Sequence, residues 1–162
     1  IPMAVDMFIK IEGIKGESKD SKHKGEIDVL AWSWGLSNSG TFHMGGGGGA
    51  GKCSMQDLSF TKYLDAGSAD LQLSCANGKH LTKATLVVRK AGETPLEYII
   101  IEMTEILVSS VSTGGSGGED RLTENVTLNF EEVHFTYWTQ TDKGGKGESS
   151  EYKYNIAENV KK

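Results

Sequence analysis

The sequence predicts a mainly β domain with one short helix. Three observations lead to this fold class: 21 glycines against 2 prolines in 162 residues, several segments with apolar residues at every second position, and one segment with helical spacing and end signals. A chain of this length with 37% hydrophobic residues can bury the core of one domain without disulfides or metals. We expect one domain over residues 3–162 and interpret Ile1-Pro2 as a cloning or cleavage remnant.

The first half of the chain predicts two strands separated by a charged loop. Apolar residues alternate through Met7, Ile9 and Ile11, which indicates a half-buried strand that ends at Gly13, and residues 15–24 carry charges of both signs, as expected for a solvated loop. A second strand is predicted over 26–36. Its even positions are expected to supply bulky core residues and its odd positions a surface poor in side chains, which can approach another chain, a ligand or a cavity. The even positions are Asp28, Leu30, Trp32, Trp34 and Leu36, and the odd ones end in Ala31, Ser33 and Gly35.

The second half predicts the helix and the longer strands. After a strand with Leu58 and Phe60, Ser68 is predicted to cap a helix that runs to Asn77 and stops at Gly78. Strands follow over 84–89, 98–103, 106–112, 122–138 and 152–156. Residues 98–101 are apolar on both faces, and a protein partner is one explanation.

The parity of the apolar residues slips at Glu131-Glu132 within the strand predicted over 122–138. Val126, Leu128 and Phe130 occupy even positions before the slip, and odd positions are apolar after it. We expect a β-bulge at the slip, which is a usual device for bending a strand at the corner of a barrel.

The composition and the motifs exclude several function classes. The net charge of −5, with basic residues spread among acids, argues against nucleic-acid binding, and no apolar run reaches the eighteen or so residues of a bilayer span. Cys53 and Cys75 are too few and too far apart for a disulfide framework or a zinc site, and we expect them to be reduced core residues. The four histidines, His23, His43, His80 and His134, are scattered, so no metal or cofactor is expected.

The glycine loop over residues 45–52 is within one residue of a phosphate-binding loop. Cys53 stands where that loop needs Ser or Thr, and neither a buried parallel strand before it nor a helix after it is predicted. We therefore expect a loop that joins two strands and is available for contact with a partner, and we predict that the protein is not an enzyme.

Two further motifs have two readings each. Trp32 and Trp34 could stack on a sugar or a base, but core packing is favoured because Leu30 and Leu36 share their face. Glu119-Asp120-Arg121 follows a glycine stretch and could form an acidic site, but a solvated turn with an ion pair to a neighbour is favoured.

Several motifs of this chain are distinctive when they are taken together. They are Leu30-Ala-Trp-Ser-Trp-Gly35, His43–Lys52, Asp57-Leu-Ser-Phe-Thr-Lys-Tyr63, Gly78-Lys-His80, Arg89-Lys-Ala-Gly92 and Leu107–Phe130. With these motifs the chain resembles the haemolysin-coregulated protein (Hcp) family, the tube protein of the bacterial type VI secretion system. The resemblance extends from about Met3 to Val160, and the long block over 107–130 is its most specific part.

The resemblance implies a fold, an assembly and partners. It implies a β-barrel of two sheets with one short helix at the side, and hexameric rings that stack into the inner tube and carry or chaperone small effector proteins in the lumen. The spike protein at the tube tip and the contractile sheath are the other expected partners. The protein is expected to be made in the bacterial cytoplasm without a signal peptide and exported by type VI secretion, without membrane insertion.

The expected contact residues follow from the small strand face and the two glycine stretches. Ala31, Ser33 and Gly35 are candidates for lining the lumen, with an ordinary second core layer as the competing reading. The candidates for contacts between subunits or between stacked rings are His43, Met44, Gly47, Lys52, Gly117, Glu119 and Asp120. The alternative function is a monomeric β-sandwich adhesin or sugar-binding module that uses Trp32 and Trp34.

Overall fold

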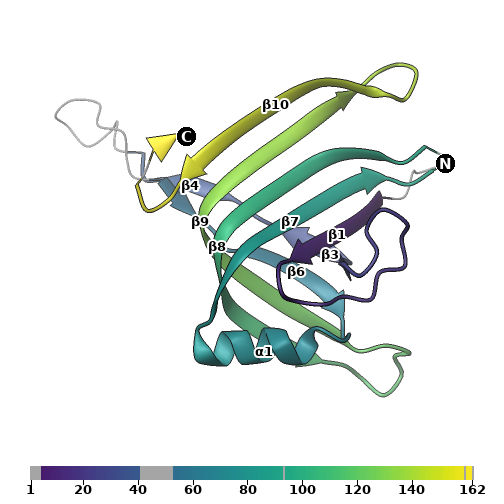
Figure 1. The fold of residues 1–162 in the computed structure, drawn as a ribbon, viewed down its shortest axis with the longest axis vertical. Helices are drawn as coiled ribbons and strands as arrows, with labels where there is room; N and C mark the ends of the chain where they lie inside the picture. The colour runs from purple at the N-terminus through teal and green to yellow at the C-terminus, as the bar shows by residue number, and fades with distance from the viewer. Residues whose placement is uncertain (1–4, 41–52, 93, 159, 162) are drawn as a thin grey trace.

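The structure is a computed structural model that describes residues 5–40, 53–92, 94–158 and 160–161, and strands dominate it (Figure 1). Among the described residues one helix accompanies eleven strands, which confirms the predicted mainly β class. The elements are β1 (Val5–Ile11), β2 (Ile27–Asp28), β3 (Ala31–Ser33), β4 (Leu36–Asn38), β5 (Cys53–Met55), β6 (Leu58–Tyr63), α1 (Ser68–Asn77), β7 (His80–Lys90), β8 (Leu96–Gly114), β9 (Thr123–Gln140), β10 (Lys146–Asn155) and β11 (Val160–Lys161).

The strands form two antiparallel sheets of very different size. Nine strands make the large sheet, in which β10, β9, β8, β7 and β1 are successive neighbours, and β4 pairs with β5 in the small one. One edge of β9 has two partners: its residues 132–140 pair with β10, and its residues 123–128 pair with β6, which in turn pairs with β3. The two strands β8 and β9 therefore form a long ribbon that both halves of the sheet share.

The barrel that was expected is not closed by continuous strand pairing. The amide of Val29 donates to the carbonyl of Met7 on β1 at 2.9 Å, and the amide of the next residue, Leu30, donates to the carbonyl of Thr61 on β6 at 2.8 Å. The chain thus changes partner within two residues, and no strand ladder joins β2 to β6 in the described part of the chain.

This change of partner corrects the prediction of one strand over 26–36. The segment forms three short strands, and its buried side switches from odd to even positions: Ile27 and Val29 are buried, and the half-buried Trp32 and Trp34 follow. Leu30 and Leu36, expected in the core, are 40% and 50% exposed.

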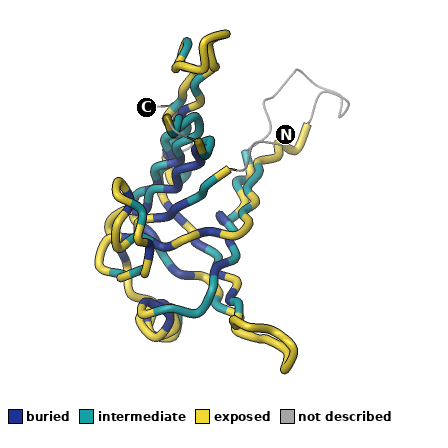
Figure 2. Tube along the Cα trace, turned by 90° about the vertical axis from the view of Figure 1, so that its right-hand side faces the viewer, coloured by how far each residue is buried: buried dark blue, intermediate teal, exposed yellow. Residues whose placement is uncertain are grey.

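The large sheet bends sharply along a line that crosses β7, β8 and β9. On β8 the buried positions are two apart on either side of this line, Ile101 and Met103 before it and Ile106 and Val108 after it. Across the line they are three apart on all three strands, from Leu81 to Ala84, Met103 to Ile106 and Phe130 to Val133. We call this line the crease. It contains Glu105, which has a positive φ of 53°. Figure 2 shows the buried residues concentrated in the middle of the fold and the exposed ones at the hairpin tips.

The crease replaces the predicted bulge at Glu131-Glu132. The pairs Thr104 with Glu132 and Ile106 with Phe130 keep one register, so no extra residue is inserted into β9 there. Because β8 changes its buried parity at the same level, the two strands bend together, and the strands predicted over 98–103 and 106–112 are one strand. The register shift between β8 and β9 lies instead between Val108 and Ser110.

The helix has the predicted bounds but not the predicted N-terminal cap. Gly67 occupies the N-cap position and has no side chain to accept a hydrogen bond, and Ser68, the first residue of the helix, uses its hydroxyl in a buried network described below. The predicted stop is confirmed: Gly78 adopts a φ of 66° and its amide donates to the carbonyl of Ser74. At ten residues, α1 is too short to cross a bilayer, and the described residues contain no other helix.

Candidate functional site

A neutral face made of small polar side chains covers the outer side of β3, β6, β9 and the end of β8. Strand pairing places two rows of residues side by side across these four strands. The first row is Ser33, Ser59, Thr127 and Ser110, and the second is Ala31, Thr61, Asn125 and Ser112. We call these eight residues the hydroxyl face; none of them carries a charge.

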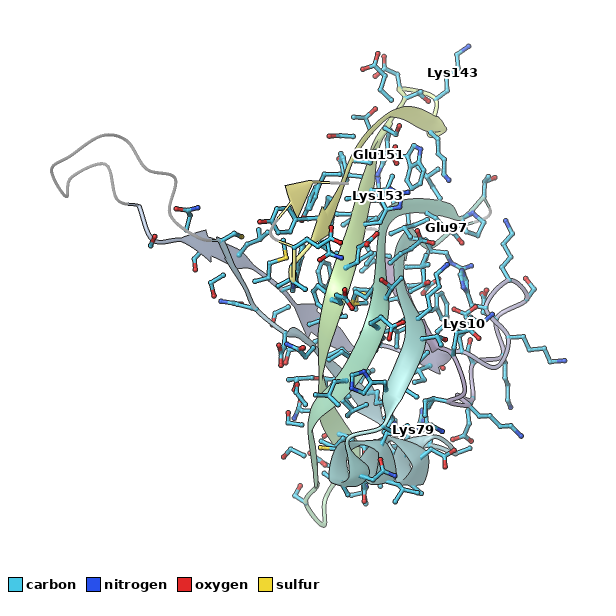
Figure 3. All side chains as sticks on the ribbon, turned by 60° about the vertical axis from the view of Figure 1, so that its left-hand side comes forward. Lys10, Lys79, Glu97, Lys143, Glu151 and Lys153 are labelled. Atoms are coloured by element: carbon cyan, nitrogen blue, oxygen red, sulfur yellow. The ribbon has the colours of Figure 1, made fainter. Side chains whose placement is uncertain are left out.

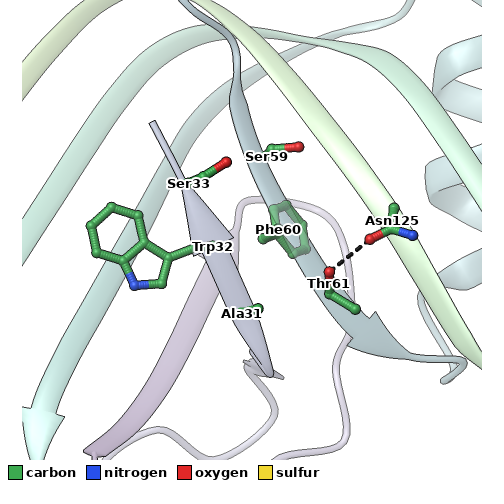
Figure 4. A pocket seen from close by; sticks show the side chains of 7 residues that line it. All are labelled: Ala31, Trp32, Ser33, Ser59, Phe60, Thr61 and Asn125. Carbon is green, nitrogen blue, oxygen red and sulfur yellow. Dashed lines mark hydrogen bonds between the residues drawn. The ribbon is translucent and has the colours of Figure 1, made fainter. Parts of the chain in front are cut away.

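The hydroxyl face is held in place by its own hydrogen bonds (Figure 4). Thr61 Oγ1 donates to Asn125 Oδ1 at 2.6 Å, and the Thr127 hydroxyl lies 2.7 Å from that of Ser110. At its border, the Asp57 carboxylate accepts hydrogen bonds from Ser109 Oγ at 2.6 Å and from Asn129 Nδ2 at 2.9 Å. Four of the polar side chains are thus paired with one another, whereas Ser33, Ser59 and Ser112 form no side-chain hydrogen bond with the described residues. The surface therefore offers hydrogen bonds without charge.

Two of the three predicted lumen residues belong to this face. Ala31 and Ser33 are exposed on β3 beside Ser59 and Thr61, and a shallow hollow of about 280 Å³ lies over them. Because they face solvent in the single subunit, they do not form a second core layer. Gly35 lies after β3, where a side chain would meet Gln56 at 3.3 Å, so its small size has a local packing reason.

The two tryptophans pack against the core, as predicted, although both remain half-buried. Trp34 stacks on Phe135 with ring centres 6.5 Å apart, and its indole nitrogen donates to the carbonyl of Gln56 at 2.9 Å. Trp32 lies on the face of β3 opposite to Ser33, next to Phe60 (Figure 4). This packing removes the basis for a sugar platform built on both rings.

The predicted contact residues in the turn between β8 and β9 are exposed. Gly117, Glu119 and Asp120 lie at the hairpin tip, where the Ser116 amide donates to Glu119 Oε2 at 3.3 Å. The ion pair expected for this turn is not found among the described residues; Arg121 instead lies 3.8 Å above the ring of Tyr63. The predicted contacts His43, Met44, Gly47 and Lys52 lie outside the described residues.

A fully buried ion pair lies on the inner side of the same strands. Lys62 Nζ is 2.7 Å from Glu124 Oε2, and both side chains are 0% exposed. Lys62 also reaches Asp65 at 3.0 Å, and Ser68 on α1 donates to Glu124 Oε2 at 2.8 Å. Burial acts to raise the pKa of Glu124, but the hydrogen bonds from Lys62 and Ser68 and the attraction of the Lys62 ammonium outweigh it, so the pKa lies below its ordinary value.

Sequence reasoning missed this pair and the extension of the hydroxyl face to β6, β9 and β8. A signal for both was present in the alternation. Lys62 follows Leu58 and Phe60 at core positions, and Glu124 precedes Val126 and Leu128 in the same way. The positions between them on each strand are Ser59 and Thr61, and Asn125 and Thr127, which point outward.

No group of three or more His, Cys, Asp or Glu side chains within the described ranges could hold a metal ion. Cys53 and Cys75 are free thiols, as predicted. Both are half-buried rather than fully buried, and Cys75 packs against the core.

Comparison with known proteins agrees with this fold. The family model described as "Type VI secretion system effector, Hcp" matches residues 8–137. The protein hcp1 of Pseudomonas aeruginosa is 62% identical over 160 residues, which cover 98% of this chain and 99% of that one. The chain belongs to the Hcp family.

Solved Hcp structures have the same architecture. A structure described as a type six secretion system protein has a TM-score of 0.92 at 31% identity and covers 98% of this chain and 100% of its own. Hcp1 from Salmonella typhimurium has a TM-score of 0.79 at 37% identity, with 99% and 100% covered. This chain is thus a type VI secretion protein. The Hcp family to which it belongs consists of structural secretion proteins rather than of known enzymes.

Proposed function

We propose that this Hcp chain forms hexameric rings that stack into the inner tube of the type VI secretion system, with the hydroxyl face lining the lumen. Membership of the Hcp family supports the tube. The hydroxyl face supports its orientation, because it is the exposed surface of a sheet whose other side is the core, and its eight residues bear no charge.

We also propose that small effector proteins are held inside the ring and later released. The absence of charge on the hydroxyl face supports this part of the proposal. Side chains such as Ser33, Thr61 and Asn125 exchange hydrogen bonds with water for hydrogen bonds with a cargo surface, with a small net gain for each. Large aromatic or charged side chains would bind some cargoes tightly and repel others. A neutral wall therefore suits reversible carriage of different small proteins.

The remaining parts of the proposed function concern the path of the protein. The chain is made in the bacterial cytoplasm, assembles there with the sheath around the tube and the spike at its tip, and leaves the cell with its cargo. It catalyses no reaction in this pathway; its work is assembly, transport and chaperoning.

The ring is tested by the solution mass of the 17.5 kDa chain, measured by chromatography with light scattering and followed by negative-stain imaging. A mass near six chains with annular particles is expected. A monomer across micromolar concentrations would contradict the ring and with it the lumen.

The orientation of the hydroxyl face is tested by placing one bulky charge on it. Thr127→Arg is expected to leave the ring intact but to prevent secretion of a small effector of the same system, because an arginine from each of six subunits would narrow and charge the channel. Ser149→Arg on the exposed β10 is the matched control and should secrete the effector normally. Equal secretion by both variants would show that Thr127 does not face the cargo.

A further inference from the structure

The loop between β1 and β2 presents four exposed lysines on a rigid support. Lys15, Lys19, Lys22 and Lys24 are all exposed, and none of them has an ion-pair partner among the described residues. We call the segment 12–26 the lysine loop. In a chain of net charge −5, such a group of free cations is an unusual surface.

The acidic side chains of the lysine loop all have partners within the subunit. Glu12 lies 3.9 Å from Lys10, and Glu17 accepts a hydrogen bond from the amide of Ala66 at 3.0 Å. The Asp20 carboxylate forms an ion pair with Arg89, which holds the pKa of Asp20 at about 2. Glu26 lies 3.0 Å from His23 Nδ1, and Glu97 on β8 lies 2.8 Å from His23 Nε2. Glu12 and Glu17 are exposed but have partners within the subunit, and Asp20 and Glu26 are half-buried, so the ammonium groups of the loop are left for a partner.

The loop is fixed before any partner arrives. His23 is buried and stacks on Phe8 with ring centres 4.5 Å apart. The amide of Gly16 donates to the carbonyl of Gly25, and a side chain on Gly16 would overlap the carbonyl of Glu26. A rigid loop loses little conformational entropy on binding, which favours a weak electrostatic contact.

The crease carries a surface of opposite sign. Glu105 and Glu131 lie opposite each other across β8 and β9, both are exposed, and neither carboxylate has a cation within the described residues. They border a groove that is also lined by His80, Ile156 and Ala157. Like charges directly opposite in a sheet repel each other, so a cation from outside would relieve the pair.

The lysine loop and this acidic groove lie on opposite sides of the subunit. In Figure 1 the loop, in purple, lies on the side of the N terminus, whereas the bends of β8 and β9 lie on the far side, next to the turn that leads to the C terminus. One chain cannot bring the two together. A second copy in the same orientation can, because a head-to-tail contact places unlike surfaces against each other.

We propose that the lysine loop of one subunit docks on the Glu105 and Glu131 groove of a second copy of this chain in the next ring. This contact rests on the proposed ring and tube and gives their stacking a polarity. The charges fix which end of a ring faces which, and salt weakens the contact because it lies at the surface.

A charge-swap experiment on the full-length rings tests this contact. The variants are K15E/K19E, which makes the loop acidic, and E105K/E131K, which makes the groove basic. Sedimentation of each ring is measured between about 50 and 500 mM salt, a range over which screening of surface charges increases strongly. K143E/K153E, at the turn between β9 and β10 and on β10 (Figure 3), is the control that matches the charge change of the loop variant, because both lysines are exposed and lie outside the lysine loop.

Each charge-swap variant alone is expected to form rings whose stacking is at least about tenfold weaker than that of the wild type at low salt, since six subunits each lose a contact. A one-to-one mixture of the two variants should stack again, because each acidic loop then meets a basic groove. The control should stack like the wild type.

The outcomes separate this contact from the proposed function. Rings of all variants that stack like the wild type, or a mixture that stacks no better than its parts, would overturn the contact while leaving the ring intact. A wild-type chain that stays monomeric would overturn the ring and the contact together.

Discussion

The two halves of the long ribbon formed by β8 and β9 place their charges in opposite ways. Above the crease, in residues 96–104 of β8 and 132–140 of β9, the inner side is apolar, with Ile101 and Met103 fully buried. The outer side there carries His134 between Glu102 and Glu151. Below the crease the charged pair of Lys62 and Glu124 is inside, and the outer side is the hydroxyl face. The neutral face is therefore not a consequence of a chain short of charges, because charges at this level are present and face inward.

The largest expected effect comes from breaking the buried pair below the crease. Lys62→Met leaves the Glu124 carboxylate, which is 0% exposed, without its cation, and should lower the free energy of unfolding by roughly 3–5 kcal/mol in urea melts. The double variant Lys62→Met/Glu124→Leu removes both charges and should recover most of the loss. If the single variant has the same free energy of unfolding as the double variant, the unpaired Glu124 carboxylate carries no penalty, and the ion pair does not explain the loss.

The same pair predicts that the free energy of unfolding depends on pH in the acidic range. Because the pKa of Glu124 is lowered on folding, its contribution to stability is present above its ordinary value of 4.5 and is lost as the pH falls through the lower, folded value. The double variant should therefore lose less stability than the wild type when urea melts are repeated at falling pH below about 4.5. Identical pH curves would show that Glu124 does not titrate with unfolding.

A smaller effect is expected at the crease that separates the two halves. Glu105 has a φ of 53°, which glycine adopts more readily, so Glu105→Gly should raise the free energy of unfolding by about 0.5–1 kcal/mol. Glu131→Gly, at the facing position of β9, is the matched control and should lower it by about the same amount. A loss of stability in both variants would mean that the Glu105 side chain itself supports the bend.

The smallest effect is expected above the crease. His134→Gln removes contacts of 3.2 Å to Glu102 and 3.1 Å to Glu151, but the three side chains are 24%, 34% and 58% exposed. Its cost should be about 0.2–1 kcal/mol and should shrink in high salt. A cost as large as that of Lys62→Met would remove the contrast between an exterior and an interior charge cluster.

Most strands and the helix could be predicted from the sequence, because their signals are local: the alternation of apolar residues within a strand and the residues at the ends of a helix. The helix bounds, the Gly78 stop and the long strand ending near Trp138 were predictable for that reason. The break after Asp28 was not, because it depends on which strands Val29 and Leu30 meet, and these partners are distant in sequence.

The site was predictable only where its residues lie on one strand. Ala31 and Ser33 could be selected as a small face from their own alternation, but their neighbours Ser59, Thr127 and Ser110 come from three other strands. The register that aligns them is set by tertiary pairing. The buried pair was hidden by the general rule that lysine and glutamate are exposed, although both stand at core positions.

The pairing of β9 with two different strands also has a consequence for the order of folding. β8 and β9 are joined by a short turn, so their ribbon closes a small loop, whereas Thr61 on β6 meets Asn125 across 64 positions of sequence. Contacts distant in sequence form more slowly because a longer loop must close. We expect the ribbon to form first. Residues 123–128 of β9 then remain unpaired on one edge until β6, which carries Lys62, pairs with them. During that interval the newly made chain exposes a strand edge, so the time before β6 docks is when it is most vulnerable to aggregation.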